Sequence, residues 1–123
     1  MKCFFLPLFL VFICCYSPER DCGDYRTGAF KYEAYVDGEI QTSIFVRDEY
    51  FQIEQYQGKI DTSEIRWINS CEFILTPVNP KSILDQYQIH MKILETTSNT
   101  YTFQYNVVGE DQKEKGIAVR LNN

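Results

Sequence analysis

From Thr27 onward, hydrophobic and polar residues alternate along the chain, and short turn sequences interrupt the alternation. Because successive side chains of a strand point to opposite faces of a sheet, this pattern is typical of half-buried strands. We expect the apolar face of each strand to be the buried one. The expected strands lie around these apolar positions: Phe30–Val36, Thr42–Val46, Phe51–Ile53, Ile65–Ile68, Cys71–Leu75, Tyr87–Ile93, Tyr101–Val107 and Ile117–Leu121.

Most of the expected strands are separated by turns of hairpin length. Asp37-Gly38 and Gln57-Gly58 are clear examples, since glycine readily adopts the positive φ that tight hairpin turns require. One connection is longer and contains Pro77 and Asn79-Pro80. Asn79 suits a helix N-cap and Pro80 the first helical position, so we expect one short helix near Pro80–Gln86.

These segments predict an all-β fold, a single antiparallel meander of about eight strands. Eight strands can close on themselves, which removes exposed sheet edges. A small, lipocalin-like up-and-down barrel is therefore the first expectation, and a strongly curved open sheet or sandwich is the alternative. The chain has 123 residues, room for one domain, which we place at residues 27–123.

The first part of the chain has a different character. Met1-Lys2 is followed by an uncharged apolar run through residue 16. A helix crossing a hydrocarbon core needs about 20 apolar residues, so this run favours a signal peptide over a membrane span. We predict a lipoprotein-type signal peptide at residues 1–14 and a polar tether at residues 15–26. The alternative is a buried N-terminal strand or helix.

The apolar run ends at the doublet Cys14-Cys15. A lipoprotein signal ends at a cysteine whose thiol receives a diacylglyceryl group, and the residue before it is small. Cys15 has the small Cys14 before it, whereas Cys14 follows the bulky Ile13 but has the aliphatic Val11 three positions earlier. We predict lipidation of Cys15, with Cys14 as the alternative. The expected location is the cell envelope, on the periplasmic face or the outer surface of the outer membrane.

The charge balance narrows the range of partners. The chain has 12 basic and 17 acidic residues, a net charge of −5, and losing Lys2 with the signal peptide makes the rest one unit more negative. Such a surface repels phosphate backbones, so nucleic acid is a poor candidate partner. The expected partners are the membrane, through the lipid, and a small apolar ligand or an envelope protein.

If Cys15 carries the lipid, the mature chain keeps two thiols, Cys22 and Cys71. In an oxidising compartment such a pair usually forms a disulfide, and two buried free cysteines are the alternative. A metal site is not expected, because His90 is the only histidine and tetrahedral sites need four ligands. The chain has no phosphate-binding glycine loop, HExxH or CxxC motif, so we expect no cofactor.

Aromatic residues are among the candidates for the interior of the barrel. Several tyrosines share strand parity with aliphatic neighbours, which predicts either a packed core or the walls of a cavity for a small apolar ligand. Trp67 is expected to pack near the disulfide, with ligand stacking as the alternative. The candidate interior-facing residues are Trp67, Tyr87, Ile89, Met91, Ile93, Tyr101, Phe103 and Tyr105.

Catalytic residues are not evident. His90 shares parity with Gln88 and Lys92, which places it on the outer face of its strand. The acidic pairs Asp48-Glu49 and Glu110-Asp111 occur where turns are expected, and general acid–base catalysis needs two carboxylates held in a cleft. We therefore predict no catalytic residues.

Several short segments resemble a family of small bacterial β-rich lipoproteins of unknown function. The segments that carry this resemblance are Arg20-Asp21-Cys22, Thr27-Gly28-Ala29-Phe30, Gln52-Ile53-Glu54, Ile65-Arg66-Trp67-Ile68-Asn69, Cys71-Glu72-Phe73 and Asn79-Pro80-Lys81-Ser82. Members of that family often carry the name DNA topoisomerase IV. A type II topoisomerase needs an ATP-binding domain or a tyrosine in a basic DNA gate, and this short acidic chain offers neither. The resemblance therefore implies a lipoprotein of unknown function.

The sequence supports two functional hypotheses from different classes. The first is a non-catalytic binding or interaction module of the cell envelope, anchored by lipid. The second is an envelope enzyme with its site in the barrel mouth. The first predicts a cavity lined by the candidate interior residues, whereas the second predicts polar groups that converge in a pocket.

Overall fold

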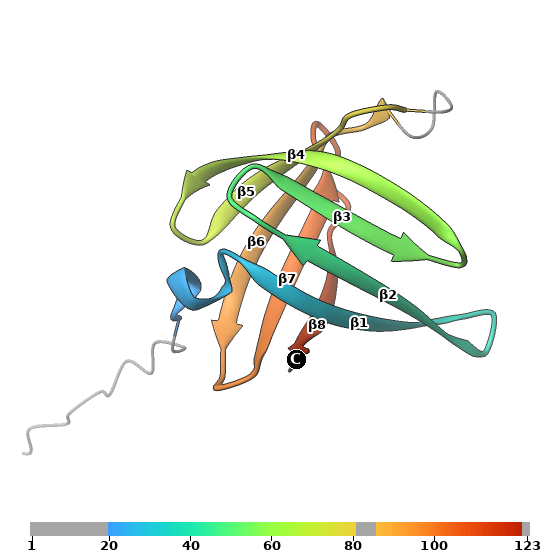
Figure 1. Ribbon diagram of the computed structural model, residues 1–123, viewed down its shortest axis with the longest axis horizontal. Coiled ribbons are helices and arrows are strands. Elements are labelled where there is room, and N and C mark those ends of the chain that lie inside the picture. The colour runs from blue at the N-terminus through green and yellow to red at the C-terminus, as the bar shows by residue number, and fades with distance from the viewer. Residues whose placement is uncertain (1–19, 81–85, 122–123) are drawn as a thin grey trace, which may run out of the picture.

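The alternating segments form strands that pair with one another in chain order (Figure 1). The computed structural model describes residues 20–80 and 86–121. Its strands are β1 (Gly28–Val36), β2 (Glu39–Arg47), β3 (Phe51–Tyr56), β4 (Lys59–Asn69), β5 (Glu72–Pro77), β6 (Ile89–Thr96), β7 (Thr100–Val107) and β8 (Glu114–Arg120). β1 also pairs with β8, which closes the sheet and confirms the predicted all-β barrel.

Two hairpin turns set the register of the first four strands. Asp37 and Gly38 have φ values of 52° and 81°, and Gln57 and Gly58 have 49° and 75°. Positive φ at both central residues defines a turn whose twist matches that of the flanking strands. Val36 therefore pairs with Glu39 across the first turn. The pairing continues without interruption along both strands.

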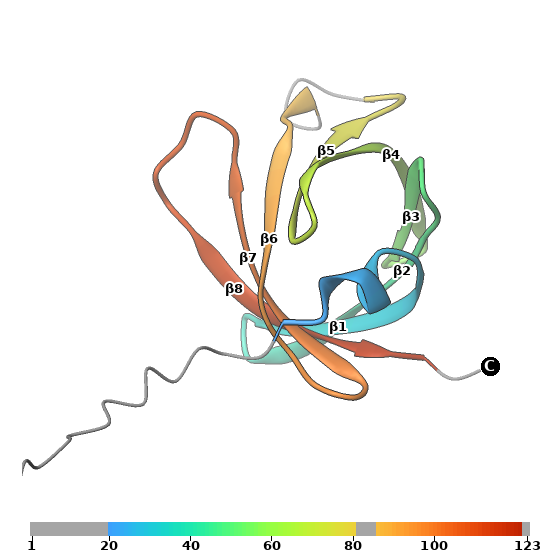
Figure 2. The same cartoon turned by 90° about the vertical axis from the view of Figure 1, so that its left-hand side faces the viewer.

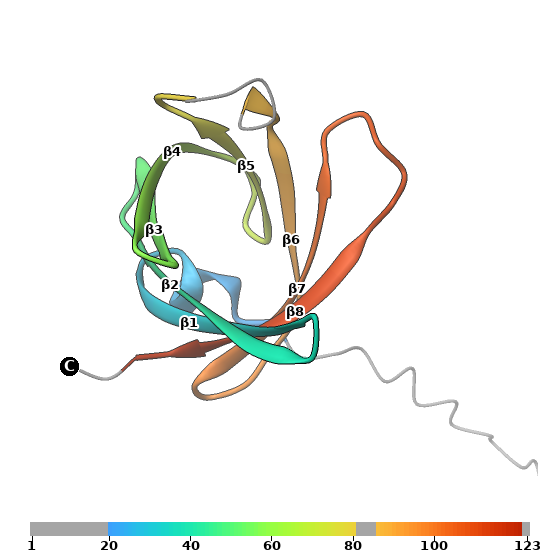
Figure 3. The same ribbon diagram turned by 90° about the vertical axis from the view of Figure 1, so that its right-hand side faces the viewer.

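The barrel has two unlike ends. One end, which we call the base, carries a 3-10 turn, η1 (Cys22–Tyr25), and the turns after β2, β4 and β6. Figure 2 views the barrel from this end, where η1 lies against the ring of strands. The other end, the mouth, carries the hairpin turns after β1 and β3 and the longer connections after β5 and β7 (Figure 3).

The half of the barrel next to the base is packed with aromatic and aliphatic side chains. Tyr25, Phe30, Phe73, Ile93 and Tyr101 have at most 1% of their surface exposed. The rings of Phe30 and Tyr101 meet edge to face, with centroids 5.3 Å apart. Edge-to-face pairs contribute about 0.5–1.5 kcal/mol beyond the burial of their apolar area. This half is the hydrophobic core of the protein.

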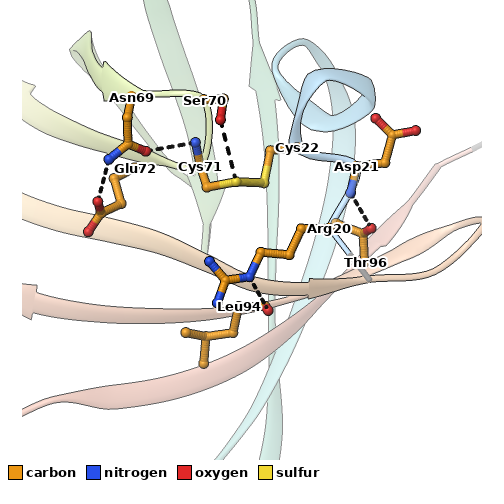
Figure 4. The surroundings of a disulfide bond; sticks show 9 residues. All are labelled: Arg20, Asp21, Cys22, Asn69, Ser70, Cys71, Glu72, Leu94 and Thr96. Carbon is orange, nitrogen blue, oxygen red and sulfur yellow. Dashed lines mark hydrogen bonds between the residues drawn. A yellow bond between two sulfur atoms is a disulfide. The ribbon is translucent and has the colours of Figure 1, made fainter. Parts of the chain in front are cut away.

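The predicted disulfide between Cys22 and Cys71 is present and ties η1 to the turn between β4 and β5 (Figure 4). Asp21 donates its backbone N–H to Thr96 Oγ1 at 2.7 Å, and Arg20 Nε donates to the carbonyl of Leu94 at 3.0 Å. Tyr25 Oη donates to the carbonyl of Thr97 at 2.6 Å. The segment from residue 20 to residue 26 was expected to be a tether, but these contacts make it part of the folded domain.

The buried faces of β2 and β3 differ from the expectation. Ile44 and Val46 point outward and are 39% and 52% exposed, whereas Phe45 and Arg47 point inward and are 6% and 2% exposed. The same inversion occurs in β3, where the inward face carries polar residues and the outward face carries Phe51 and Ile53. The reason is the hairpin register, because side chains paired across two antiparallel strands share a face.

Most of the expected helix near Pro80–Gln86, namely residues 81–85, lies outside the described residues.

The closure of the barrel between β1 and β8 is short. Its register covers Phe30 with Arg120, Lys31 with Val119, and Tyr32 with Ala118. Beyond these pairs, the strands separate toward the mouth, and Figure 3 shows the β7–β8 hairpin leaning away from β1.

Candidate functional site

The half of the barrel next to the mouth contains a cavity of about 250 Å³, which we call the cup. The cup is lined by Tyr32, Ser43, Phe45, Gln52, Glu54, Leu75, Ile89, Met91, Phe103 and Tyr105. A second hollow of about 440 Å³ shares Gln52, Glu54, Leu75 and Ile89 with it and extends to the rim at Pro77, Pro80 and Tyr87. The barrel is thus packed at the base and hollow toward the mouth.

One wall of the cup is apolar. Leu75, Ile89 and Met91 come from adjacent strands, and Phe103 continues this wall on β7. The rings of Phe103 and Tyr32 lie edge to face against Gly116 of β8, with centroids 5.3 Å apart. A Cβ at Gly116 would lie 2.5 Å from Tyr32 Cε2, so only glycine allows the ring to lie there. Small-molecule sites are mostly lined by apolar side chains of this kind.

The opposite wall is polar and is formed by the inverted faces of β2 and β3. Ser43, Gln52 and Glu54 supply a hydroxyl, an amide and a carboxyl group to the cup. Phe45 pairs with Glu54, and Arg47 with Gln52, so all of these side chains share the interior face. The cup therefore has one apolar wall and one wall of hydrogen-bonding groups, which suits a ligand with a polar edge.

Arg47 lies below the cup and holds the base together. It is 2% exposed, and its guanidinium lies 4.9 Å from the ring centroids of both Phe30 and Phe73. Its Nε donates to the carbonyl of Arg26 at 3.2 Å, and its Nη2 to the carbonyl of Tyr25. Burying an unpaired charge is costly unless its hydrogen bonds are satisfied. Here carbonyl and side-chain oxygens supply the acceptors.

Gln52 connects Arg47 to the cup. Arg47 Nη1 donates to Gln52 Oε1 at 3.1 Å, and this bond fixes the orientation of the amide because a guanidinium can only donate. Gln52 is 6% exposed and lines both the cup and the hollow above it. Among the described residues, no hydrogen bond uses its Nε2. The positive charge of Arg47 also polarises the amide and strengthens Nε2 as a donor.

Glu54 and Asp61 face each other across β3 and β4 on the polar wall. Burial raises the pKa of Glu54, and the negative charge of Asp61 raises it further. The ion pairs seen within residues 20–80 and 86–121 join Lys31 to Glu33 and His90 to Glu72, so neither involves Glu54. The carboxyl of Glu54 is therefore an acceptor in the cup without a cation beside it.

Tyr105 lines the cup, whereas Tyr101 lies in the packed half of the barrel. Burial, with a smaller effect from the neighbouring Tyr32, raises the pKa of Tyr105 to about 12. Tyr105 therefore stays a neutral phenol at physiological pH and can donate a hydrogen bond. Burial also raises the pKa of Tyr101, whose hydroxyl accepts from Arg47 Nη1 at 3.3 Å in the packed half.

The interior-facing candidates from the sequence divide between the two halves of the barrel. Ile93 and Tyr101 lie in the packed half, whereas Ile89, Met91, Phe103 and Tyr105 line the cup. Tyr87 differs from the expectation, because it precedes β6, is 48% exposed and lies at the rim. Trp67 packs on Phe73 with ring centroids 4.6 Å apart and does not line the cup.

The residues that the sequence did not single out are those of the polar wall and the base. Gln52 and Glu54 alternate with Phe51 and Ile53, a pattern that favours a solvent-facing position for both, and nothing in the sequence pattern marks Ser43 or Arg47 as site residues. The sequence feature that could have predicted their inward orientation is the two-residue turn at Asp37-Gly38. This turn puts position 45 of β2 opposite Phe30, so the odd-numbered residues of β2 face inward.

Two features of the outer surface are alternatives to the cup. A groove of about 780 Å³ follows the gap between β1 and β8, and Lys31, Glu33 and Lys115 among its lining residues give it mixed charge. The outer face of β2 and β3 carries an apolar patch, which we define as Ile44, Val46, Phe51 and Ile53, 39–52% exposed. The cup is favoured because it lies inside the barrel and combines an apolar wall with hydrogen-bonding groups.

The described residues show neither a metal site nor a membrane-spanning helix. Residues 20–80 and 86–121 contain no group of three or more His, Cys, Asp or Glu side chains placed to hold a metal ion. Within the same ranges, no helix has the length and hydropathy needed to cross a membrane. No protein-family model, curated protein or solved structure matches this chain.

Proposed function

We propose that this protein is an exported, lipid-anchored envelope protein that binds a small, largely apolar molecule in the cup without transforming it. The observation that carries this proposal is the cavity of about 250 Å³ in the mouth half of a barrel whose base half is packed. That volume corresponds to about eight water molecules, or a ligand on the order of ten non-hydrogen atoms.

The position of the base supports the anchoring part of the proposal. Arg20 is hydrogen-bonded at the base, and Cys15 precedes it by five positions. Five residues span at most about 18 Å. A lipid on Cys15 therefore directs the base toward the membrane and the mouth away from it. The disulfide supports the export part, because such bonds persist in oxidising compartments.

The anchor is tested by metabolic labelling with an alkyne analogue of palmitate. We expect the wild-type protein to be labelled and Cys15→Ser to lose nearly all of the label, with Cys14→Ser as the matched control that retains it. The opposite pattern would move the anchor to Cys14. An unlabelled wild-type protein, or label that survives when both cysteines are changed, contradicts lipid anchoring.

Ligand binding is tested by filling the cup. We expect 2-phenylethanol, an aromatic ring with one hydroxyl, to bind with a Kd on the order of 1 mM or tighter. Ser43→Trp should abolish binding, because the indole occupies the cup. The matched control is Thr42→Trp, which adds the same group to the outer face of the same strand.

Binding is measured by chemical-shift titration of the purified protein. Equal affinity in the two tryptophan variants would mean that the probe binds elsewhere, and the cup would lose its role. A wild-type protein that binds no compact apolar probe at all contradicts the proposed function.

The enzyme hypothesis rests on the same residues. A buried carboxyl group with a raised pKa in a cavity is a frequent feature of catalytic sites, and Glu54 has that environment. A binding protein returns its ligand unchanged, whereas an enzyme converts it. Recovery of bound ligands from the native protein, followed by mass spectrometry before and after incubation, separates the two.

A further inference from the structure

The amide of Gln52 offers a hydrogen-bond donor to the cup. Its Oε1 is held by Arg47 Nη1 at 3.1 Å, and the side chain is 6% exposed. Its Nε2 has no hydrogen-bond partner among the described residues and is not one of their buried unpaired atoms, so it is open to water in the cup. A ligand that covers Nε2 must bring an oxygen acceptor to it, because otherwise the donor loses its hydrogen bond to water without a replacement.

The carboxyl of Glu54 requires the complementary group. Glu54 lies two residues after Gln52 on the same face of β3, about 7 Å along the strand. Both side chains line the cup. Because an ionised carboxylate can only accept, a ligand group near Glu54 must donate a hydrogen bond. Donor and acceptor are thus arranged in order from the base toward the mouth.

The groups around the cup disfavour an ionic ligand. Glu54 and Asp61 repel an anion on the polar wall and near the mouth. The Glu54 carboxyl attracts a cation, but the buried guanidinium of Arg47 lies directly beyond Gln52 and repels a cation at the floor of the cup. An ammonium group also offers no acceptor to Gln52 Nε2. A neutral group that both accepts and donates a hydrogen bond pairs with both side chains.

We infer that the cup selects a neutral molecule with a compact apolar body and one group that both accepts and donates a hydrogen bond, namely a hydroxyl or a carboxamide. The acceptor atom of that group meets Gln52 Nε2, and its donor meets the Glu54 carboxyl. The apolar body lies on Leu75, Ile89 and Met91. This inference rests on the proposed function, since it specifies the ligand class of the same site.

A matched series of probes tests the ligand class. The probes share a phenyl ring and differ in the polar group: 2-phenylethanol, 2-phenylacetamide, 2-phenylethylamine as the cation and phenylacetate as the anion. At pH 7.5 we expect the two neutral probes to bind at least about 10-fold more tightly than either ion, a difference of about 1.4 kcal/mol. Titrations use the full protein as purified from the cells that make it.

Gln52→Glu tests the donor without removing the partner of Arg47. The new carboxylate still accepts from Arg47, but its second oxygen presents an acceptor to the cup where Nε2 presented a donor. We expect both neutral probes to bind about 10-fold more weakly. Gln55→Glu is the matched control, because it makes the same change on the exposed outer face of the same strand and should alter affinity less than 2-fold.

A second variant keeps the inference testable if Gln52→Glu fails to fold. Glu54→Gln removes the negative charge from the polar wall and preserves the shape of the side chain. We expect phenylacetate to gain at least about 3-fold in affinity relative to 2-phenylethanol, because one of the two repelling carboxylates is gone. The unfolding transition of each variant, followed by circular dichroism, confirms that the fold is kept.

The outcomes separate this inference from the proposed function. Neutral probes that bind better than ions, with loss in Gln52→Glu and not in Gln55→Glu, support the inference. Equal binding of all four probes, a preference for an ion, or an unaffected Gln52→Glu protein overturns the ligand class and leaves the cup as a binding site. If none of the four binds the wild-type protein, the proposed function fails as well.

Discussion

Replacing Arg47 with alanine is expected to lower the free energy of unfolding by about 3–5 kcal/mol, because the change leaves a cavity and unpaired acceptors in the base. The carbonyls of Tyr25 and Arg26 lose their donor, and so do Gln52 Oε1 and the hydroxyl of Tyr101. The total free energy of unfolding of a domain of this size is about 5–15 kcal/mol. The loss should therefore be visible at room temperature by urea denaturation.

Two further variants identify the cause of that loss. Arg47→Met fills most of the space but donates no hydrogen bonds, so it should fall between wild type and Arg47→Ala. Arg66→Ala removes an exposed arginine from β4 and should change stability by less than about 0.5 kcal/mol. An Arg47→Ala protein that unfolds at the same urea concentration as Arg66→Ala would show that the buried guanidinium does not stabilise the base.

Loss of the Cys22–Cys71 disulfide is expected to lower the free energy of unfolding by about 4 kcal/mol. The two cysteines are 49 residues apart, and closing a loop of that length removes entropy from the unfolded chain. Loss of the disulfide should also weaken the hydrogen bonding of Arg47. Without the disulfide, η1 is held by fewer contacts, and η1 carries the carbonyl of Tyr25 that Arg47 uses.

The disulfide is tested by comparing urea unfolding with and without reductant, followed through Trp67, the only tryptophan. The matched control is the double variant Cys22→Ser and Cys71→Ser, whose stability should be low and should not respond to reductant. A reductant effect below about 1 kcal/mol on the wild-type protein would contradict this account, because the chain-entropy estimate for the loop is several times larger.

The sequence was sufficient for the number of strands and most turns, and barrel closure was its first expectation, with an open sheet or sandwich as the alternative. Strand alternation is a local property, and the glycines at Gly38 and Gly58 mark turns that only a few residues determine. The meander followed from hairpin-length connections alone. The disulfide could also be foreseen once Cys14 and Cys15 were assigned to the leader and its end. The structure confirms the fold and the disulfide.

The faces of β2 and β3 could not be predicted from hydrophobicity. Ile44, Val46 and Ile53 have the character of core residues, yet the structure exposes them. Register overrides hydrophobicity here, because an inward Phe30 fixes an inward Phe45 across an uninterrupted hairpin. Turning these strands over would bury the isoleucines but would break the pairing with β1.

This conflict between local pattern and structure coincides with the candidate site. Functional sites are where a sequence is expected to depart from the pattern that stability alone favours. Gln52 and Glu54 lie in the hollow half of the barrel, where apolar residues would add stability. The packed half, with Arg47 and the disulfide, supplies the rigidity that lets the other half stay open.

The central claim is that a small molecule lies inside the barrel, between its apolar and polar walls. The most direct test is the pattern of nuclear Overhauser contacts between bound 2-phenylethanol and the methyl groups of the protein. We predict contacts to Leu75, Ile89 and Met91 in the cup, and none to Ile93 in the packed half. Contacts to Ile44, Val46 and Ile53 of the outer apolar patch instead would contradict the account.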